Sequence, residues 1–199
     1  MTTQKQLVLA SKSPRRKELL EQIGLQFIIH PSDFEEKDEH LSAEELAMHN
    51  AMGKAQQLAR KYKNALIIGV DTVVSFQHHQ INKPKDEEDA KRILRLLSNT
   101  THQVISAICI IDTDNGKNIS GLEVTNVTMD RLDEKDIAAY IASGEGEDKA
   151  GAYAIQGLGA LYVKKIEGDY FNVVGLPIFL LRRLLTKFKF VISFDAKEI

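Results

Sequence analysis

The sequence contains one cysteine, no long apolar run and almost no net charge. The single thiol, Cys109, excludes an intrachain disulfide and favours a reducing compartment. No apolar segment approaches the roughly 20 residues of a membrane-spanning helix, and nothing near the N-terminus resembles a signal peptide. With 26 Lys and Arg against 28 Asp and Glu, the formal charge of -2 gives the surface no general attraction to nucleic acid or to an anionic membrane. These absences predict a soluble, cytoplasmic protein without nucleic-acid or membrane partners.

Signals for a domain boundary are absent as well. The chain has no internal repeat, no low-complexity tract and no linker rich in Pro or Ser, so residues 1–199 are predicted to form a single domain. The hydrophobic share of 43% and the charged share of 27% are ordinary for a globular protein. A chain of 199 residues can bury roughly 70% of its unfolded surface, which allows two lobes around a cleft.

Short apolar runs alternate with segments of helical periodicity along the chain. The apolar runs predict strands at 5–10, 26–30, 65–76, 102–112 and 118–130, and further strands within 152–166 that are broken at Gly157 and Gly159. Five helices are predicted. The first runs from Pro14 to just before Gly24, and the second runs from a capping box of Ser42 and Glu45 to about Tyr62. The third begins near Asp86, the fourth runs from Asp133 to about Ser143, and the fifth begins with Pro177 as its first helical residue. Hairpins mixed with helical crossovers predict an α/β domain with a mixed, twisted sheet and flanking helices.

Two features conflict with a purely structural role. Arg15, Arg16 and Lys17 lie in the first turn of a predicted helix, where the macrodipole disfavours cations. A bound phosphate would reverse that effect, although a solvated basic turn is the alternative. Asp71 lies inside the apolar run LIIGVDTVV, where an ionised carboxylate needs a metal, a cation or hydrogen-bond donors in place of water. The alternative for Asp71 is a turn cap at the end of that run.

Further charged residues give weaker signals. Lys54 falls on the apolar stripe of its helix, which fits a phosphate contact or a side chain that extends along the face to solvent. Lys83 precedes Pro84 and is therefore in extended backbone, but by itself it reads as a surface lysine. Five acids could supply metal ligands, namely Asp33, Glu35, Glu36, Asp38 and Glu39. Such a run of charges is more often a solvated loop.

Six segments between about Leu7 and Pro177 carry a more specific signal: LASKSPRRKELL, FEE, GVDTVV, INKPKDEEDA, EDKAGAYAIQGLGA and GDYFNVVGLP. Together, in this order and spacing, they resemble the Maf family of nucleoside triphosphate pyrophosphatases. The resemblance implies a fold related to that of inosine triphosphatases, with a deep cleft between two lobes. It also implies a metal-dependent reaction that converts a nucleoside triphosphate to its monophosphate and pyrophosphate.

The resemblance also assigns roles to individual residues. Asp71 matches the family's catalytic carboxylate, usually described as the proton acceptor, and would also hold the metal. Glu36 matches the acid expected to help hold that metal, a divalent cation such as Mg²⁺ or Mn²⁺. The residues that fall where the family has phosphate contacts or other cleft cations are Ser11, Arg16, Lys54 and Lys83.

Three positions look like the subgroup of the family that acts on dTTP and UTP. They are Arg15 in the SPRR form of the first motif, Thr72 after the catalytic Asp, and Gln156 in the IQG motif. The amide of Gln156 offers a donor and an acceptor, which match O4 and N3–H of thymine or uracil. The resemblance thus implies hydrolysis of dTTP, UTP or modified pyrimidine nucleotides, with roles in nucleotide-pool cleansing and cell division arrest.

Other interpretations stay open at this stage. A phosphatase could form an aspartyl-phosphate on Asp71, but that chemistry would want a carboxylate two residues on, where Val73 stands. A nucleotide-binding regulator of septum formation without significant turnover is the non-enzymatic alternative. The sequence also leaves open the physiological substrate, the preferred metal and whether the chain forms a homodimer.

Overall fold

The computed structural model describes residues 5–36 and 41–192. Its centre is a seven-stranded mixed sheet in the order β2-β1-β3-β5-β6-β7, with β4 paired to β3 beside this path. β1 is parallel to β2 and β3, and the other pairings are antiparallel. The strands are β1 (Gln6–Ala10), β2 (Ile28–Ile29), β3 (Ala65–Phe76), β4 (His79–Ile81), β5 (Thr101–Asp112), β6 (Asn118–Met129) and β7 (Val163–Glu167).

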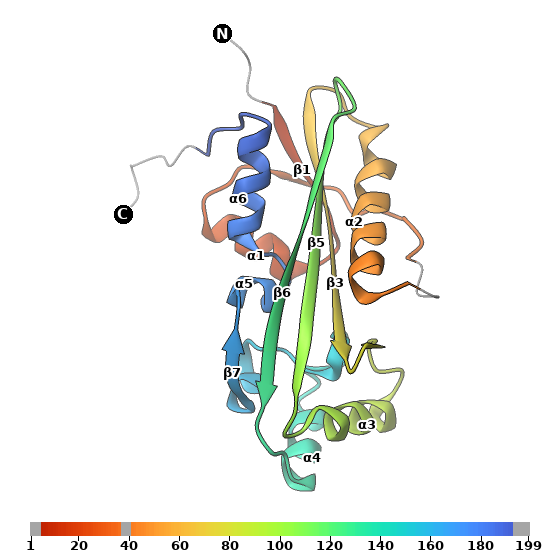
Figure 1. The fold of residues 1–199 in the computed structure, drawn as a ribbon, viewed down its shortest axis with the longest axis vertical. Helices are drawn as coiled ribbons and strands as arrows, with labels where there is room; N and C mark the ends of the chain where they lie inside the picture. Colours follow the sequence, from red (N-terminus) through yellow and green to blue (C-terminus); the bar gives the residue numbers. More distant parts are fainter. Residues whose placement is uncertain (1–4, 37–40, 193–199) are drawn as a thin grey trace.

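Helices cover both faces of the sheet (Figure 1). On one face, α2 (Ala43–Ala59) packs against β3 and β5. The other face carries α1 (Pro14–Gln22) and α6 (Ile178–Lys187). The far ends of the long strands carry α3 (Glu87–Leu97) and α4 (Glu134–Ala142), which lie against each other. The protein is therefore an α/β protein with a mixed sheet and flanking helices, as the sequence predicts.

β3 explains how a polar site can form inside this sheet. The strand is buried along almost its whole length because helices lie on both of its faces. Successive side chains alternate between the faces, so Ile67 and Val73 join the α2 cluster while Ile68 and Val70 join the other. Asp71 shares the alternation of Ile67 and Val73, and its side chain therefore points toward α2.

Most of the predicted elements are confirmed. Ser42 caps α2 through the expected capping box with Glu45, and Asp86 caps α3 by accepting from the backbone N–H of Asp89. The strands predicted at 102–112 and 118–130 form an antiparallel hairpin, β5 and β6. Cys109 is buried in β5, and burial raises the pKa of its thiol. Within residues 5–36 and 41–192, no helix has the length and apolar character needed to cross a membrane.

Several boundaries differ from the prediction. The strand at 26–30 is reduced to Ile28–Ile29, and α2 ends at Ala59 rather than near Tyr62. Pro177 is the N-cap of α6 rather than its first helical residue, because its ψ of 96° is still extended. The sequence prediction also missed two short elements, β4 and the helix α5 (Tyr170–Val174).

The segment 152–166 is the largest correction. In place of strands it contains the last residue of the 3-10 turn η1 (Ala150–Ala152) and all of a second, η2 (Gly157–Leu161), and only its end, from Val163, is a strand, β7. Gly157 has a φ of +72°, and a Cβ on Gly159 would lie 1.9 Å from the carbonyl oxygen of Ala154. These glycines therefore let the chain fold closely back on itself instead of interrupting an extended strand.

Candidate active site

A cavity of about 710 Å³ opens where the β1–α1 turn, the segment after β2, α2, β3 and η1 meet. It is lined by residues of both signs of charge and by apolar side chains. Eight of the nine residues to which the family resemblance assigns a role line it: Ser11, Arg15, Arg16, Glu36, Lys54, Asp71, Thr72 and Lys83. Residues that are far apart in the chain therefore meet in one place.

Asp71 is held by two side chains of α2. It is only 6% exposed, its Oδ1 accepts a hydrogen bond from Lys54 Nζ at 2.6 Å, and its Oδ2 accepts one from Asn50 Nδ2 at 3.3 Å. Asn50 and Lys54 are four residues apart and share one face of the helix. Gly69 permits this approach, because a Cβ there would lie 2.0 Å from the carbonyl oxygen of Ala51. The buried carboxylate thus has the cation and the donor that its burial requires.

Lys54 joins two carboxylates. Its ammonium lies 2.6 Å from Asp71 Oδ1 and 2.6 Å from Glu36 Oε1. The residue is 9% exposed, so the side chain does not carry its charge out to solvent, and that alternative is wrong. Burial would raise the pKa of Glu36, but the hydrogen bond and charge of Lys54, with the charges of Lys83 and Arg16, hold it below its ordinary value.

Arg16 connects α1 to the rest of the site. Its Nε donates to the carbonyl of Gly175, one terminal nitrogen donates to Ser11 Oγ and the carbonyl of Val70, and the other donates to Thr72 Oγ1, at 2.9–3.1 Å. Four of the five N–H donors of the guanidinium are used in this way. Burial lowers the pKa of Arg16, and the charge of Asp71 opposes that effect. Arg16 therefore orients Ser11 and Thr72 as much as it offers charge to a ligand.

Lys149 and Asn50 are site residues that the sequence reasoning missed. Lys149 lines the cavity, and burial together with the charges of Arg15 and Lys83 lowers its pKa. It lies in the EDKAGAY segment that carries the family resemblance, which could have indicated it. Asn50 could have been found from its position four residues before Lys54 on the same helix face. Burial also lowers the pKa of Arg15. Three cations, Arg15, Lys83 and Lys149, therefore line this cavity, and Lys149 forms an ion pair with Asp148 in the same lining.

Gln156 is the one predicted site residue outside this lining. It is exposed at the start of η2, whereas its neighbour Ile155 lines the cavity. The role of Gln156 in reading a base stays a prediction. Of the five acids considered as metal ligands, Asp33 and Glu36 line the cavity and the exposed Glu35 does not, while Asp38 and Glu39 lie outside the described residues.

The donor set around Lys54 fits a divalent cation. Glu36 and Asp71 supply hard carboxylate oxygens that converge on one cationic position. The buried Oδ1 of Asn50, beside them, has no hydrogen-bond partner among the described residues. Among all the described residues, 5–36 and 41–192, no group of three or more His, Cys, Asp and Glu residues could hold a metal ion. A cation here would therefore take at most two carboxylates from the chain and its other ligands from substrate and water.

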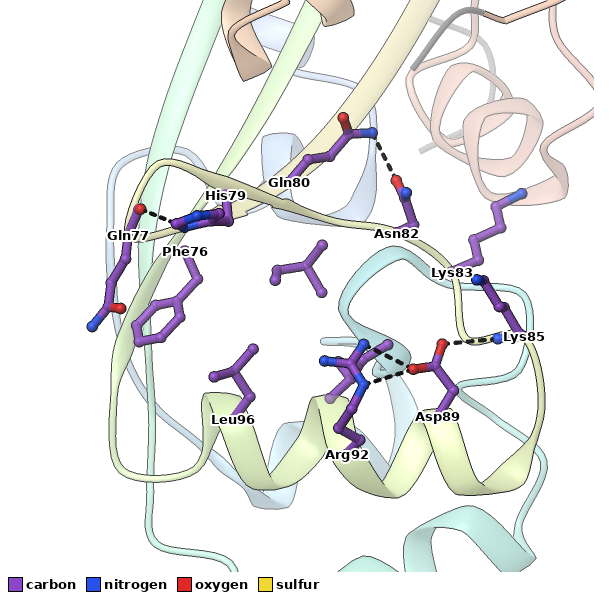
Figure 2. Close-up of a pocket in the computed structure, with 12 residues that line it drawn as sticks. Phe76, Gln77, His79, Gln80, Asn82, Lys83, Lys85, Asp89, Arg92 and Leu96 are labelled. Carbon is purple, nitrogen blue, oxygen red and sulfur yellow. Dashed lines mark hydrogen bonds and ion pairs between the residues drawn. The ribbon is translucent and has the colours of Figure 1, made fainter. Parts of the chain in front are cut away.

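A second cavity of about 470 Å³ lies between β4 and α3 (Figure 2). In its wall, Asp89 accepts hydrogen bonds from Arg92 and from the backbone N–H of Lys85. Lys83 borders both cavities, and Figure 2 shows its side chain extending away from α3. The lining of this cavity contains no buried carboxylate comparable with Asp71. The larger cavity is accordingly the candidate active site.

A cationic cavity around a buried carboxylate on an α/β scaffold defines the class of the protein, an enzyme built for a polyanionic, phosphate-containing substrate. More particularly, the chain belongs to the Maf family, since the family model described as Maf-like protein matches residues 6–188. It is 45% identical to the dTTP/UTP pyrophosphatase of Methanosarcina barkeri, over 92% of this chain and 94% of that protein. It is 46% identical to the dTTP/UTP pyrophosphatase of Dictyoglomus turgidum, over 92% of this chain and 96% of that protein. A solved structure of the Ham1 protein of Staphylococcus aureus aligns with a TM-score of 0.45 and 16% identity, over 63% of this chain and 72% of that chain.

Proposed function

We propose that the protein hydrolyses dTTP and UTP to the nucleoside monophosphate and pyrophosphate. The observation that carries this proposal is the buried Asp71, bound to Lys54 within a cavity that Arg15, Lys83 and Lys149 also line. Relatives that are 45–48% identical over most of the chain are named dTTP/UTP pyrophosphatases, which supports the choice of substrate.

The charges of the cavity suit a large anionic leaving group. Arg16, Lys54 and Lys83 approach the cavity from three different elements and can together stabilise a departing pyrophosphate. A γ-phosphatase would instead gather its cations around one transferred phosphoryl group, commonly with a P-loop, and the P-loop motif G-x-x-x-x-G-K-[ST] is absent from the sequence. In this proposal water therefore attacks the α-phosphorus, and pyrophosphate is the leaving group.

Asp71 accepts the proton of the attacking water in this proposal. Its Oδ2 is the atom for that role, because its contact with Asn50 at 3.3 Å is longer than the 2.6 Å contact of Oδ1 with Lys54. Maf-type pyrophosphatases generally use divalent metals, and Glu36 and Asp71 would hold one here. When bound, Mg²⁺ or Mn²⁺ would supply charge neutralisation for the triphosphate and an acidified water.

Base selection is assigned to Arg15, Thr72 and Gln156. Thr72 is fixed by hydrogen bonds with Arg16 at 3.0 Å and Ser106 at 2.8 Å, so its position in the cavity wall is rigidly defined. Modified pyrimidine triphosphates present the same N3–H and O4 pair as thymine and uracil when the modification lies elsewhere on the ring. Removal of such nucleotides from the cellular pool is the biological role that this specificity suits.

A substrate panel with product identification tests the proposal. Purified protein with Mg²⁺ or Mn²⁺ should release nucleoside monophosphate and pyrophosphate in equal amounts, and chelation should stop the reaction. In ¹⁸O-labelled water a single turnover should place label on one product only. A nucleoside diphosphate with orthophosphate, or a phosphorylated Asp71 trapped by rapid quench, would establish the phosphatase instead. Tight nucleotide binding without turnover would establish the regulator.

A further inference from the structure

The ammonium of Lys54 occupies the position where the two candidate metal ligands meet. Its Nζ lies 2.6 Å from an oxygen of Asp71 and 2.6 Å from an oxygen of Glu36. It also lies 3.5 Å from the carbonyl oxygen of Val70. In the free protein, the cation between these carboxylates is therefore one that the chain itself supplies.

Because the ion pair of Lys54 and Asp71 is buried, a second cation cannot easily bind the same carboxylate oxygens. The side chains of Lys54 and Asp71 are 11% and 9% exposed, so water screens their charges weakly. A charged lysine has three donors and no acceptor, so it cannot become a ligand of a second cation. A divalent ion that approached the same oxygens would be repelled by the ammonium until Lys54 moved away.

We infer that Lys54 is an internal counter-ion that keeps divalent metal out of the site until a polyphosphate draws the ammonium away. This inference rests on the proposed function for the identity of that polyphosphate, a nucleoside triphosphate. Arg15, Lys83 and Lys149 line the same cavity, so an entering triphosphate would lie within reach of the α2 lysine. The phosphate oxygens then replace the carboxylates as partners of Lys54.

The consequence is a coupling between two ligands. Release of Asp71 and Glu36 from Lys54 makes their oxygens available only when the nucleotide is present, so metal and nucleotide bind together. Linkage requires the reverse effect to be equal, so the metal strengthens nucleotide binding by the same factor. An enzyme arranged in this way would not hold Mg²⁺ permanently in the absence of substrate.

The test measures Mn²⁺ binding to the full chain without any nucleotide, by titration followed with electron paramagnetic resonance. Lys54→Met should bind Mn²⁺ at least tenfold more tightly than the wild type, because the carboxylates lose their internal cation. Lys83→Met is the matched control, since it removes one positive charge from the same cavity but no ion pair with Asp71. Its Mn²⁺ affinity should stay within about twofold of the wild type.

Two further measurements keep the inference testable if Lys54→Met is unstable. With Lys54 in place, Asp71→Asn should change the Mn²⁺ affinity of the nucleotide-free protein by no more than about twofold, because Lys54 already keeps metal out of the wild-type site. Lys54→Arg retains the positive charge and should bind Mn²⁺ like the wild type. A loss of more than about twofold in Asp71→Asn, or a gain of less than tenfold in a folded Lys54→Met, overturns the inference. Neither outcome touches the proposed function, which is judged separately by turnover of UTP.

Discussion

Gly53 of α2 lies directly beneath the ring of Phe34, so closely that a Cβ on the glycine would be 2.2 Å from Phe34 Cζ. Phe34 lines the cavity of the candidate active site and also packs against His49 at a ring-centroid distance of 5.8 Å. Glu36, which contacts Lys54, follows two residues later. The absence of a side chain at Gly53 thus allows the segment from Phe34 to Glu36 to pack against α2 and places Glu36 at the site, although glycine is unfavourable within a helix.

Gly53→Ala should lower the free energy of unfolding by about 1–3 kcal/mol, the usual cost of overpacking, and should reduce kcat by displacing Glu36. Urea denaturation and steady-state kinetics measure the two effects. In a Phe34→Ala background the same change should be neutral or stabilising by up to about 1 kcal/mol, since alanine is the better helix former. Destabilisation of equal size in both backgrounds would show that the ring is not the reason for the glycine.

Asp71→Asn should lower kcat about 10²- to 10⁴-fold while nucleotide binding remains measurable, because the amide cannot accept a proton from water. Asp33→Asn is the matched control, since Asp33 lines the same cavity but its side chain is 79% exposed. That control should keep activity within a few fold of the wild type. An Asp71→Asn enzyme with near-normal kcat would remove Asp71 from the mechanism.

Gln156→Glu should reduce the preference for dTTP and UTP over CTP, because a carboxylate lacks the N–H that the amide offers to O4. The relevant measurement is kcat/KM for dTTP, UTP, CTP and GTP with each enzyme. A wild type that prefers GTP or CTP would contradict the assignment of base selection to this residue, and so would an unchanged ranking in the variant.

Lys149 should give nucleotide binding an alkaline pH dependence. Burial and the charges of Arg15 and Lys83 hold the pKa of Lys149 below its ordinary value of 10.5, so its ammonium is lost at a lower pH than that of a free lysine. KM for UTP should therefore rise as pH increases through this lowered pKa. Lys149→Met should raise KM about tenfold at neutral pH and remove that alkaline rise. Lys12→Met, in a lysine whose side chain is 72% exposed, should leave the alkaline rise in place.

His102 should make the protein less stable in mild acid. Burial lowers the pKa of this histidine from 6.5 to about 4, and its Nε2 lies 2.7 Å from the hydroxyl of Tyr153. The unfolded chain binds a proton near pH 6.5 while the folded protein does not until about pH 4. Between those values His102 should contribute a loss of about 1.4 kcal/mol of stability per unit fall in pH.

Denaturation of His102→Gln between pH 4 and pH 7 measures that contribution. The slope of unfolding free energy against pH should become shallower in this variant, because its side chain does not titrate. His79→Gln changes an exposed histidine and should retain the wild-type slope. Equal slopes for wild type and His102→Gln would show that folding does not prevent His102 from binding a proton in this pH range.

The sequence by itself determined the elements whose signals are local. Strands β3, β5 and β6 follow from their apolar runs, and α2 and α3 from periodicity and capping residues, because burial on one or both faces dictates those patterns. Asp71 and Lys54 were identifiable for the same reason, as charges in positions that packing alone would fill with apolar side chains. The motifs also indicated the Maf family, which the family model and the relatives confirm.

Only the tertiary structure decided how these residues combine. Arg16 bonds to partners 5, 54, 56 and 159 residues away, and no local pattern specifies such contacts. The placement of Asn50 against Asp71 depends on Gly69, which lets α2 approach β3. Within the segment 152–166, η2 forms in place of a strand because Gly157 has a positive φ and lies against the side chain of Glu145, and Gly159 lies against the backbone carbonyl of Ala154. Periodicity records which face of an element is buried, whereas the three-dimensional packing of distant elements determines which polar groups meet there.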